Sequence, residues 1–343
     1  MNKLSLEQAM QIAIDEAYKG FAFVSPNPRV GCVVLDHQGY LLSTGHHTRF
    51  GQPHAEVEAL KGLSQEQLQG AHVIVTLEPC AHEGQTPSCA KMLAQMPLAQ
   101  VTYGLIDPNP LVAGQGAEII RRAGIQVNEY QGPLKNDLEE ACEEFLWNFR
   151  HKKTFVALKV AQSLDGKIAL KNGESQWITG PESRQRVHEL RAQYDAVLVG
   201  KKTVLQDNPS LNVRHPAIQK ENQVVVLDRS GDVLKNTSEL NIFKTHSKDH
   251  IHILSSSNLS EALDELYNRG IRSVMVEGGG EIFASFLKEN LVQRLHVFMA
   301  PVLIGQGMSW TEGFSIPSLE QKIQLKSIKT RPVGRDLHLT ARI

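Results

Sequence analysis

The residues best suited to chemistry lie between residues 53 and 89, where one histidine, one glutamate and two cysteines follow one another. His54, Cys80 and Cys89 offer an imidazole and two thiolates, which can hold Zn²⁺ and leave its fourth position open, as in catalytic zinc sites. Glu56 need not be a ligand. A free carboxylate beside zinc can take a proton from water and return it to a ring and its departing amine. The pattern therefore predicts a zinc site for hydrolytic deamination, with Glu56 as the proton carrier.

The order His-x-Glu, Pro-Cys and a second Cys is the signature of zinc deaminases, whose two cysteines usually stand two residues apart. Here residues 81–88 separate Cys80 from Cys89, so the spacing is atypical. Other interpretations stay open. His54 could be an ordinary histidine, the cysteines could be buried thiols, or His82 could complete a structural zinc site as the fourth ligand.

The second half of the chain carries a glycine run that suits a phosphate. Residues 278–280 are all glycine and precede a predicted helix, so bare backbone amides would lie at a helix N-terminus. Three glycines also make a tight turn, and the run is not the GxGxxG of a Rossmann fingerprint. Other polar clusters follow predicted strands and are either turns and solvated surface or a site for a charged ligand. They are Lys159 with Ser163 and Asp165, Arg191 with Asp195, and residues 207–214.

Apolar periodicity predicts the elements that must position these residues. Strands alternate with helices in both halves, which indicates the α/β class. In the first half we expect helices after Ser5 and Pro53 and over 90–96, 118–123 and 134–150, with strands over 31–35, 40–44, 71–77 and 100–104. In the second half we expect strands over 154–161, 195–200, 223–227, 251–254, 272–277 and 294–299, with helices over 181–193, 259–269 and 281–290.

Length and composition indicate two globular domains, which we place at residues 1–148 and 149–343. The chain is 41% hydrophobic and 21% charged, as in ordinary globular proteins. Its net charge of −1 gives no electrostatic footprint for nucleic acid or for an anionic membrane.

The start of the chain and its cysteines indicate a cytoplasmic protein. No apolar run reaches the roughly 18 residues of a membrane span. Glu7 and Asp15 stand where a signal peptide would need an unbroken apolar core. Cys32 and Cys142 lie in apolar segments, and we expect both to be buried and reduced.

Longer motifs show a resemblance to a known family that covers about residues 5–340. SPNPRVG, HAE, TLEPC, TPSC and DPNP in the first half, with KVAQSLDGKIA, GESQWITG, RAQYDAVLVGKKTV, DNPSLNVR and VEGGG in the second, resemble the bifunctional deaminase–reductase of riboflavin biosynthesis. In that family the longer spacer between the cysteines is usual. The resemblance implies a cytidine-deaminase-like three-layer domain followed by a dihydrofolate-reductase-like domain, which binds NADPH without the Rossmann glycines.

The resemblance also implies two consecutive reactions on a small molecule. Zinc-dependent hydrolysis would remove the 2-amino group of a phosphoribosylamino-diaminopyrimidinone. NADPH would then reduce the ribosyl group of the resulting aminouracil to a ribityl chain. The implied cofactors are Zn²⁺ and NADPH, and the family suggests a homo-oligomer, either a dimer or a tetramer.

Matching positions give the deaminase residues that the resemblance implies. Zinc would be held by His54, Cys80 and Cys89, beside Glu56 as the catalytic group. Amide, imidazole and carboxylate groups suited to a pyrimidine and a ribose phosphate would come from Asn27, His47, Asp107 and Asn109.

The reductase residues are implied in the same way. The substrate would meet Ser175, Arg191, Leu211, Arg214 and Glu277. The two arginines suit a phosphate held by paired hydrogen bonds, and Lys159 with Glu277 would polarise or protonate the opened sugar imine. NADPH would meet Ala161, Trp177, Thr203, Asp207, Gly279, Gly280, Glu281, Ile282, Phe283, Ala284 and Ser285.

Two positions depart from the family pattern. Gln85 stands where a basic residue is usual, near the expected substrate, and Ala81 stands where a serine is usual.

Two other functions stay open. One is a nucleic-acid deaminase, such as one acting on tRNA adenosine, with an unrelated C-terminal half. The other is a non-enzymatic sensor that binds zinc and a nucleotide.

Overall fold

The computed structural model of the chain describes residues 2–83, 87–109 and 113–343. The chain forms two compact units, Met1–His151 and Lys152–Ile343. The first unit ends with helix α7 (Glu143–His151), so the predicted boundary between residues 148 and 149 falls inside that helix.

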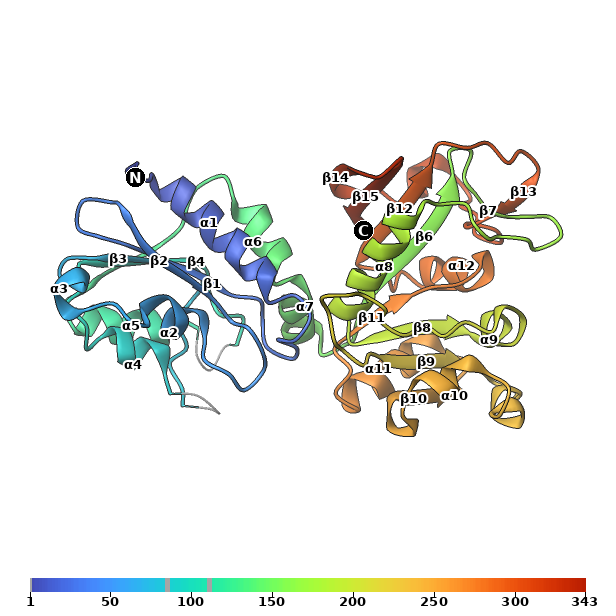
Figure 1. Cartoon of the computed structure of the whole chain (residues 1–343), viewed down its shortest axis with the longest axis horizontal. Coiled ribbons are helices and arrows are strands. Elements are labelled where there is room, and N and C mark those ends of the chain that lie inside the picture. Colours follow the sequence, from blue (N-terminus) through green and yellow to red (C-terminus); the bar gives the residue numbers. More distant parts are fainter. Residues whose placement is uncertain (1, 84–86, 110–112) are drawn as a thin grey trace. The chain divides into compact units, whose positions relative to one another are not determined.

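A five-stranded sheet with the order β2-β1-β3-β4-β5 forms the middle layer of the first unit (Figure 1). Its strands are β1 (Gly31–Leu35), β2 (Leu41–His46), β3 (His72–Leu77), β4 (Gln100–Leu105) and β5 (Gln126–Glu129). β1 pairs antiparallel with β2 and β3, whereas β3, β4 and β5 run parallel. The parallel strands end at one edge of the sheet, where loops that carry polar residues meet.

Helices cover both faces of this sheet, as the three-layer prediction requires. On one face, residues of α1 (Leu6–Lys19), α6 (Lys135–Ala141) and α7 share a buried cluster with Val33 and Leu35. On the other face, residues of α2 (Ala55–Leu60), α3 (Gln65–Leu68), α4 (Cys89–Leu93) and α5 (Gln115–Arg122) pack with Cys32 and Val34. Alternate residues of β1 therefore enter opposite cores, as the pleat of a strand dictates.

The predicted helix over 134–150 is interrupted at Cys142, where α6 ends and α7 begins. Buried Arg29 donates from its Nε to the carbonyl of Ala141 at 2.6 Å, so it occupies an oxygen that a continuous helix would need. The sequence interpretation also missed β5, because this four-residue edge strand buries Val127 and shows no clear alternation.

The second unit is built on an eight-stranded sheet with the order β10-β9-β8-β11-β6-β12-β15-β14. These strands are β6 (Phe155–Ser163), β8 (Ala196–Gly200), β9 (Gln223–Leu227), β10 (Ile251–Leu254), β11 (Ser273–Val276), β12 (Arg294–Ala300), β14 (Lys326–Val333) and β15 (Asp336–Arg342). The strands from β10 to β12 are parallel, and β15 and β14 add an antiparallel edge. A separate two-stranded ribbon pairs β7 (Lys167–Leu170) with β13 (Gly307–Ser309).

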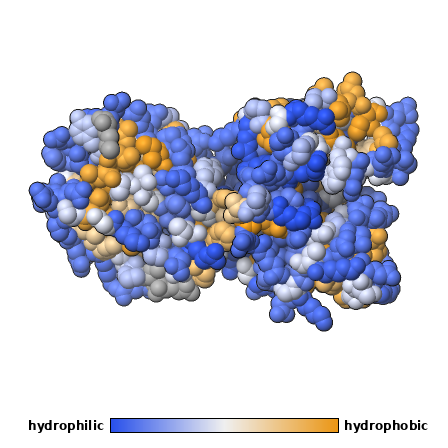
Figure 2. Space-filling model, viewed as in Figure 1, coloured by the Kyte–Doolittle hydropathy of each residue, from blue (hydrophilic) through white to orange (hydrophobic). Residues whose placement is uncertain are grey.

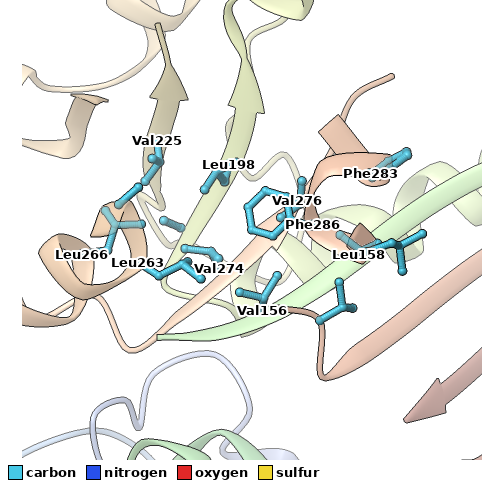
Figure 3. Close-up of a cluster of buried hydrophobic side chains, with 14 of the residues drawn as sticks. Val156, Leu158, Leu198, Val225, Leu263, Leu266, Val274, Val276, Phe283 and Phe286 are labelled. Atoms are coloured by element: carbon cyan, nitrogen blue, oxygen red, sulfur yellow. The ribbon is translucent and has the colours of Figure 1, made fainter. Parts of the chain in front are cut away.

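The helices of the second unit enclose its apolar core. They are α8 (Pro181–Gln193), α9 (Lys201–Asp207), α10 (Asn241–Thr245), α11 (Leu259–Asn268) and α12 (Gly280–Lys288), with single turns η1 (Val233–Asn236), η2 (Lys248–His250) and η3 (Leu319–Gln321). Figure 3 shows Val156 and Val274 of the sheet between Leu263 of α11 and Phe286 of α12, all buried. This packing holds β6 and β11 rigidly, and both strands lead into polar residues of the candidate site.

The sequence interpretation missed several elements of the second unit, among them α9, α10, the ribbon of β7 and β13, and the hairpin of β14 and β15. β14 reads KSIKTRPV, and most of its residues are exposed. Lysine, arginine and proline are typical of an edge strand that avoids further pairing. Their polarity hides the alternation by which a strand is recognised in sequence.

The surface is mostly hydrophilic on the face that Figure 2 shows, with small separate hydrophobic patches. Within the described part of the chain, none of the helices has both the length and the hydropathy to cross a membrane.

Candidate functional site

Three predicted zinc ligands meet at one end of the first sheet. His54 is the N-cap of α2, Cys80 follows β3, and Cys89 opens α4. The Nδ1 of His54 lies 3.6 Å from the Sγ of Cys80 and 3.4 Å from the Sγ of Cys89, and the three ligand atoms are all within 4.8 Å of one another. Tetrahedral zinc would separate its sulfur and nitrogen ligands by about 3.5 Å. The donor set and its spacing therefore fit zinc.

The two thiols differ in their readiness to ionise. A shared hydrogen bond with Cys89 and the neighbouring His54 lower the pKa of Cys80 to about 4. The same shared bond and burial raise the pKa of Cys89. The backbone N–H of Cys89 also donates to the Sγ of Cys80 at 3.3 Å. One sulfur is thus a thiolate at neutral pH, which is the form that binds a metal.

Glu56 lies in the first turn of α2 and is 3% exposed. Burial, and next the Cys80 thiolate, raise the pKa of Glu56 to about 7. Gly45 of β2 allows α2 to approach the sheet, because a Cβ at this glycine would lie 2.3 Å from the backbone N of Ala59. The direct packing of α2 on β2 fixes the positions of both His54 and Glu56.

Asn27 and His47, two predicted substrate residues, are hydrogen-bonded to each other beside the zinc ligands. His47 Nδ1 lies 3.0 Å from the carbonyl of Pro53, which can only accept, so this nitrogen carries the proton. His47 Nε2 therefore accepts from Asn27 Nδ2 at 3.1 Å. The His47 ring meets the His54 ring edge-on, with centroids 5.3 Å apart. This chain of contacts holds a neutral imidazole against the metal ligand.

Asp107 and Asn109 reach the same end of the sheet through the loop after β4. The backbone N–H of Asn109 donates to Asp107 Oδ1 at 2.8 Å, and burial raises the pKa of Asp107. Electrostatic interactions with Cys80 and His82 place Asp107 close to the zinc residues.

Glu78 anchors this loop and was missed by the sequence interpretation. Its buried carboxylate accepts hydrogen bonds from the backbone N–H groups of Asp107 at 3.3 Å, Gly114 at 3.0 Å and Ala117 at 3.1 Å. Glu78 thus ties the segment that carries Cys80 to the loop that carries Asp107. The sequence signal that could have revealed Glu78 is a charged residue directly after an apolar strand.

The structural-zinc alternative is not supported by the described residues. The cluster that could hold a metal there consists of His54, Cys80 and Cys89, whereas His82 is exposed and does not belong to it. Ala81 is buried beside Cys80. Gln85, whose departure from the family pattern concerned the substrate, lies outside the described residues.

A second polar centre lies in the second unit around Glu277, which is 7% exposed. Arg191 of α8 donates from Nε to Oε1 at 2.7 Å and from its terminal nitrogen to Oε2 at 3.2 Å. Lys159 of β6 places its Nζ 2.9 Å from Oε2. Burial by itself would raise the pKa of Glu277, but the two cations hold it below its ordinary value. Glu277 is therefore ionised at neutral pH and orients both cations.

The two arginines predicted to hold a phosphate differ in their surroundings. Two nitrogens of Arg191 are directed to Glu277, and its remaining NH1 donates to the carbonyl of Asn212 at 3.2 Å. Arg214 is exposed, and its NH1 donates to Asn212 Oδ1 at 3.2 Å. Arg214 is thus the guanidinium better placed to meet a ligand. Leu211, which precedes it in the same loop, is buried.

The residues predicted to meet NADPH lie on three elements and one loop. Ala161 is on β6, and Thr203 and Asp207 are on α9. Gly278, with a φ of 142°, lies against α9, because a Cβ there would be 3.2 Å from Thr203 Oγ1. Trp177 is 68% exposed with the Arg184 guanidinium 4.6 Å from its ring centroid. Ser175, a predicted substrate residue, is exposed in the same segment.

The glycine run reaches the start of α12, with Gly279 as N-cap and Gly280 as first residue. The predicted residues that follow are Glu281, Ile282, Phe283, Ala284 and Ser285. Phe283 and Ala284 are buried, and Phe283 belongs to the apolar core, so these two could offer a ligand only their backbone. Glu281 is held by Lys202 at 2.7 Å.

Comparison with known proteins covers both units. The family profile "Cytidine and deoxycytidylate deaminase zinc-binding region" matches residues 4–105, and "RibD C-terminal domain" matches residues 154–339. The chain is 37% identical to the riboflavin biosynthesis protein RibD of Aquifex aeolicus, over 96% of each chain. It is 34% identical to RibD of Escherichia coli, over 97% of this chain and 98% of the other.

Two solved structures resemble the chain over nearly its full length. A deaminase/reductase of Thermotoga maritima, named for diaminohydroxyphosphoribosylaminopyrimidine and 5-amino-6-(5-phosphoribosylamino)uracil, gives a TM-score of 0.85 at 35% identity over 98% of each chain. RibD of Acinetobacter baumannii gives 0.82 at 34% identity over 97% of each chain.

Proposed function

Because this chain belongs to the RibD family of bifunctional deaminase–reductases in riboflavin biosynthesis, we propose which residues carry out each of its two reactions. The enzyme uses zinc to hydrolyse an amino group from its pyrimidine substrate and NADPH to reduce the ribosyl group of the product. The alternative of an unrelated C-terminal half is wrong, because residues 154–339 match the RibD C-terminal domain. A sensor without activity is likewise excluded by the family.

The first unit carries out deamination, and His54, Cys80 and Cys89 hold the zinc. The observation that carries this assignment is the convergence of one imidazole nitrogen and two sulfurs within 4.8 Å, beside a buried carboxylate outside that set. Zinc, when bound there, supplies a Lewis acid that makes water a nucleophile near neutral pH.

Glu56 carries the protons of this reaction. Its carboxylate takes one proton from the attacking water as a new C–O bond forms at the ring carbon. It gives that proton to the ring nitrogen, and a further proton transfer lets the exocyclic nitrogen leave as ammonia as the C–N bond breaks. Because Glu56 is buried, its carboxylate is shielded from bulk water. Its place on α2 holds it one turn or less from His54.

Asn27, His47, Asp107 and Asn109 bind and orient the pyrimidine. His47 is neutral, with its Nδ1 proton on the carbonyl of Pro53, so the pair with Asn27 offers polar edges without a charge. Asp107, tied through Glu78 to the segment of Cys80, offers a carboxylate from the loop after β4. Fixed polar groups of this kind give a substrate its orientation.

The second unit carries out the reduction, and Lys159 is the proton donor. NADPH, when bound, would supply the hydride that C1 of the opened ribosyl group needs. The ammonium of Lys159, oriented by Glu277 at 2.9 Å, gives a proton to the imine nitrogen, so that the C=N bond becomes an amine. Arg191 keeps Glu277 ionised and oriented, and Arg214 binds the substrate phosphate.

The residues that would hold the cofactor come mainly from the glycine run and α9. Gly279 and Gly280 open α12, a helix long enough for its N-terminal amides to attract a phosphate group. Thr203 of α9 lies against this turn and Asp207 ends the same helix, and Ala161 of β6 and exposed Trp177 would contact the remaining parts of the dinucleotide. Ser175 and Leu211 would contact the reductase substrate.

Assembly and compartment complete the proposal. We expect a homo-oligomer, a dimer or a tetramer, which light scattering would measure. We also expect the enzyme to act in the cytoplasm, in keeping with four free cysteines, two of them buried outside the zinc site. Fractionation of cells that express the tagged chain would test this.

One experiment tests both assignments at once. Purified protein is analysed for zinc content and then supplied with the phosphoribosyl pyrimidine, while ammonia release and NADPH consumption are followed separately. The proposal expects about one zinc per chain, ammonia release that needs no NADPH, and NADPH consumption that needs the deaminated product. Protein without bound zinc that still releases ammonia would contradict the first assignment.

A further inference from the structure

The loop over residues 207–214, which carries Leu211 and Arg214, has an unusual backbone. Asn208 and Leu211 have positive φ angles of 42° and 52°. Asparagine tolerates this left-handed region, but leucine rarely adopts it, because its Cβ crowds the following carbonyl. Leu211 is also 3% exposed. A backbone in this region persists only where its surroundings impose it, and such positions gather at functional sites.

Asn222 imposes this conformation from one side. It immediately precedes β9 and is 1% exposed. Its Oδ1 accepts from the backbone N–H of Val213 at 3.1 Å, and its Nδ2 donates to the carbonyl of Leu211 at 3.1 Å. One buried amide therefore satisfies the backbone on both sides of Asn212 while Leu211 is in its left-handed conformation.

His188 holds the same loop from α8. Its Nδ1 accepts from the backbone N–H of Arg214 at 3.1 Å, and Arg191, one turn later on α8, donates to the carbonyl of Asn212 at 3.2 Å. The charged groups that face His188 are Arg191, Arg214 and Glu277. Burial, and next the two arginines, lower the pKa of His188 to about 4, so its ring stays neutral and keeps the acceptor that Arg214 uses.

We propose that Asn222 and His188 are positioning residues of the reductase, which fix the backbone of residues 211–214 and thereby the point where Arg214 meets the substrate phosphate. The inference rests on the proposed reductase function of the second unit. Arg214 has a long exposed side chain, so binding through it depends on how firmly its backbone is held. Neither positioning residue touches the reacting atoms, and both act through Arg214 and Leu211.

The test compares four variants by steady-state kinetics of NADPH consumption with the aminouracil substrate. Asn222→Ala and His188→Ala are expected to raise the substrate KM about tenfold or more, while the KM for NADPH and ammonia release stay unchanged. His188→Gln is expected to restore most of the affinity, because the amide oxygen can accept from Arg214. Thr154→Val is the matched control, since it removes buried hydroxyl contacts to Leu263 and Ile271 in the same unit. It should lower the melting temperature and leave KM unchanged.

Four results separate the possible failures. An unchanged substrate KM in both alanine variants, or an equal rise in Thr154→Val, would overturn the inference. Unaltered protein that consumes no NADPH with the aminouracil would instead overturn the proposed function. If Asn222→Ala does not fold, the pair His188→Ala and His188→Gln decides: equal KM values in the two variants would overturn the role of the acceptor.

Discussion

Two buried glutamates, Glu56 in the first unit and Glu277 in the second, show how the same side chain can serve opposite purposes. Each is less than a tenth exposed and lies beside a predicted catalytic centre. At Glu56, burial and the Cys80 thiolate raise the pKa to about 7. At Glu277, burial is overcome by Arg191 and Lys159, which hold the pKa below its ordinary value. Both carboxyl groups are buried, so the difference between their pKa values comes from their charged neighbours.

This difference separates a carboxyl group that can exchange protons near neutral pH from one that stays ionised there. Glu56 can accept and return a proton near neutral pH, as a general base must. Glu277 keeps its charge and instead holds two cations in fixed positions. The same isosteric change, glutamate to glutamine, therefore provides a matched pair of experiments, one in each unit.

The largest expected effect follows Glu56→Gln. An amide cannot take a proton from water, so ammonia release should fall by about four orders of magnitude. The ligands His54, Cys80 and Cys89 are untouched, so the zinc content should stay the same. NADPH consumption with the aminouracil supplied directly should also be unchanged, since Glu56 belongs to the other unit.

Zinc analysis and two separate assays check this prediction. The comparison between the two glutamates would break if Glu56→Gln lost both activities, because the reactions would then not be separable. It would also break if the variant released ammonia at the normal rate.

Glu277→Gln should have the next largest effect, now on the other reaction. Lys159 and Arg191 lose the anion that orients them, and the reductase kcat should fall about a hundredfold. The variant should also be less stable by about 3 kcal/mol, because removing one partner leaves buried charges uncompensated. Denaturant unfolding and NADPH consumption measure the two effects, and ammonia release is the internal control. Full reductase activity would show that Lys159 needs no partner.

Residue types made the zinc site predictable, because thiols, imidazoles and carboxylates have few other uses in that order. His54, Cys80 and Cys89 are brought together as their residue types and order suggested, although the spacing between the two cysteines is longer than in the usual signature. Glu78 and Asn222 were not predictable, since each is a common residue whose role is to accept or donate to backbone groups far along the chain. Such contacts exist only in the folded protein and leave no local pattern.

Prediction of the strands and helices also failed where an element depends on distant contacts or lacks an apolar pattern. Most were predictable from apolar periodicity, and helix 181–193 and strands 223–227 and 251–254 have the expected bounds. The break at Cys142 was not, because it depends on Arg29 reaching Ala141 from a distant loop. β14 was missed because an exposed edge strand need not be apolar.

Arg214→Ala sharpens the comparison within the second unit. Arg191 is directed to Glu277, so Arg214 is the guanidinium expected to bind the substrate phosphate. Its loss should raise the reductase KM about tenfold with little change in kcat, since one charge-assisted interaction is removed. Arg191→Ala should lower kcat as well, because it disturbs Glu277. Equal changes in KM and kcat for both variants would show that the arginines share one role.

The smallest expected effect is a pH dependence of stability that separates the two glutamates. The pKa of Glu277 is lower in the folded protein than its ordinary value of 4.5, so its contribution to stability is complete above that value and is lost as the pH falls below it. Glu277→Gln lacks this titration. The difference in unfolding free energy between the unaltered protein and Glu277→Gln should therefore narrow as the pH falls from about 6 to about 3. Urea unfolding at a series of pH values measures it, with Thr154→Val as a control whose difference should not depend on pH. A constant difference for Glu277→Gln would mean that Arg191 and Lys159 do not govern its charge.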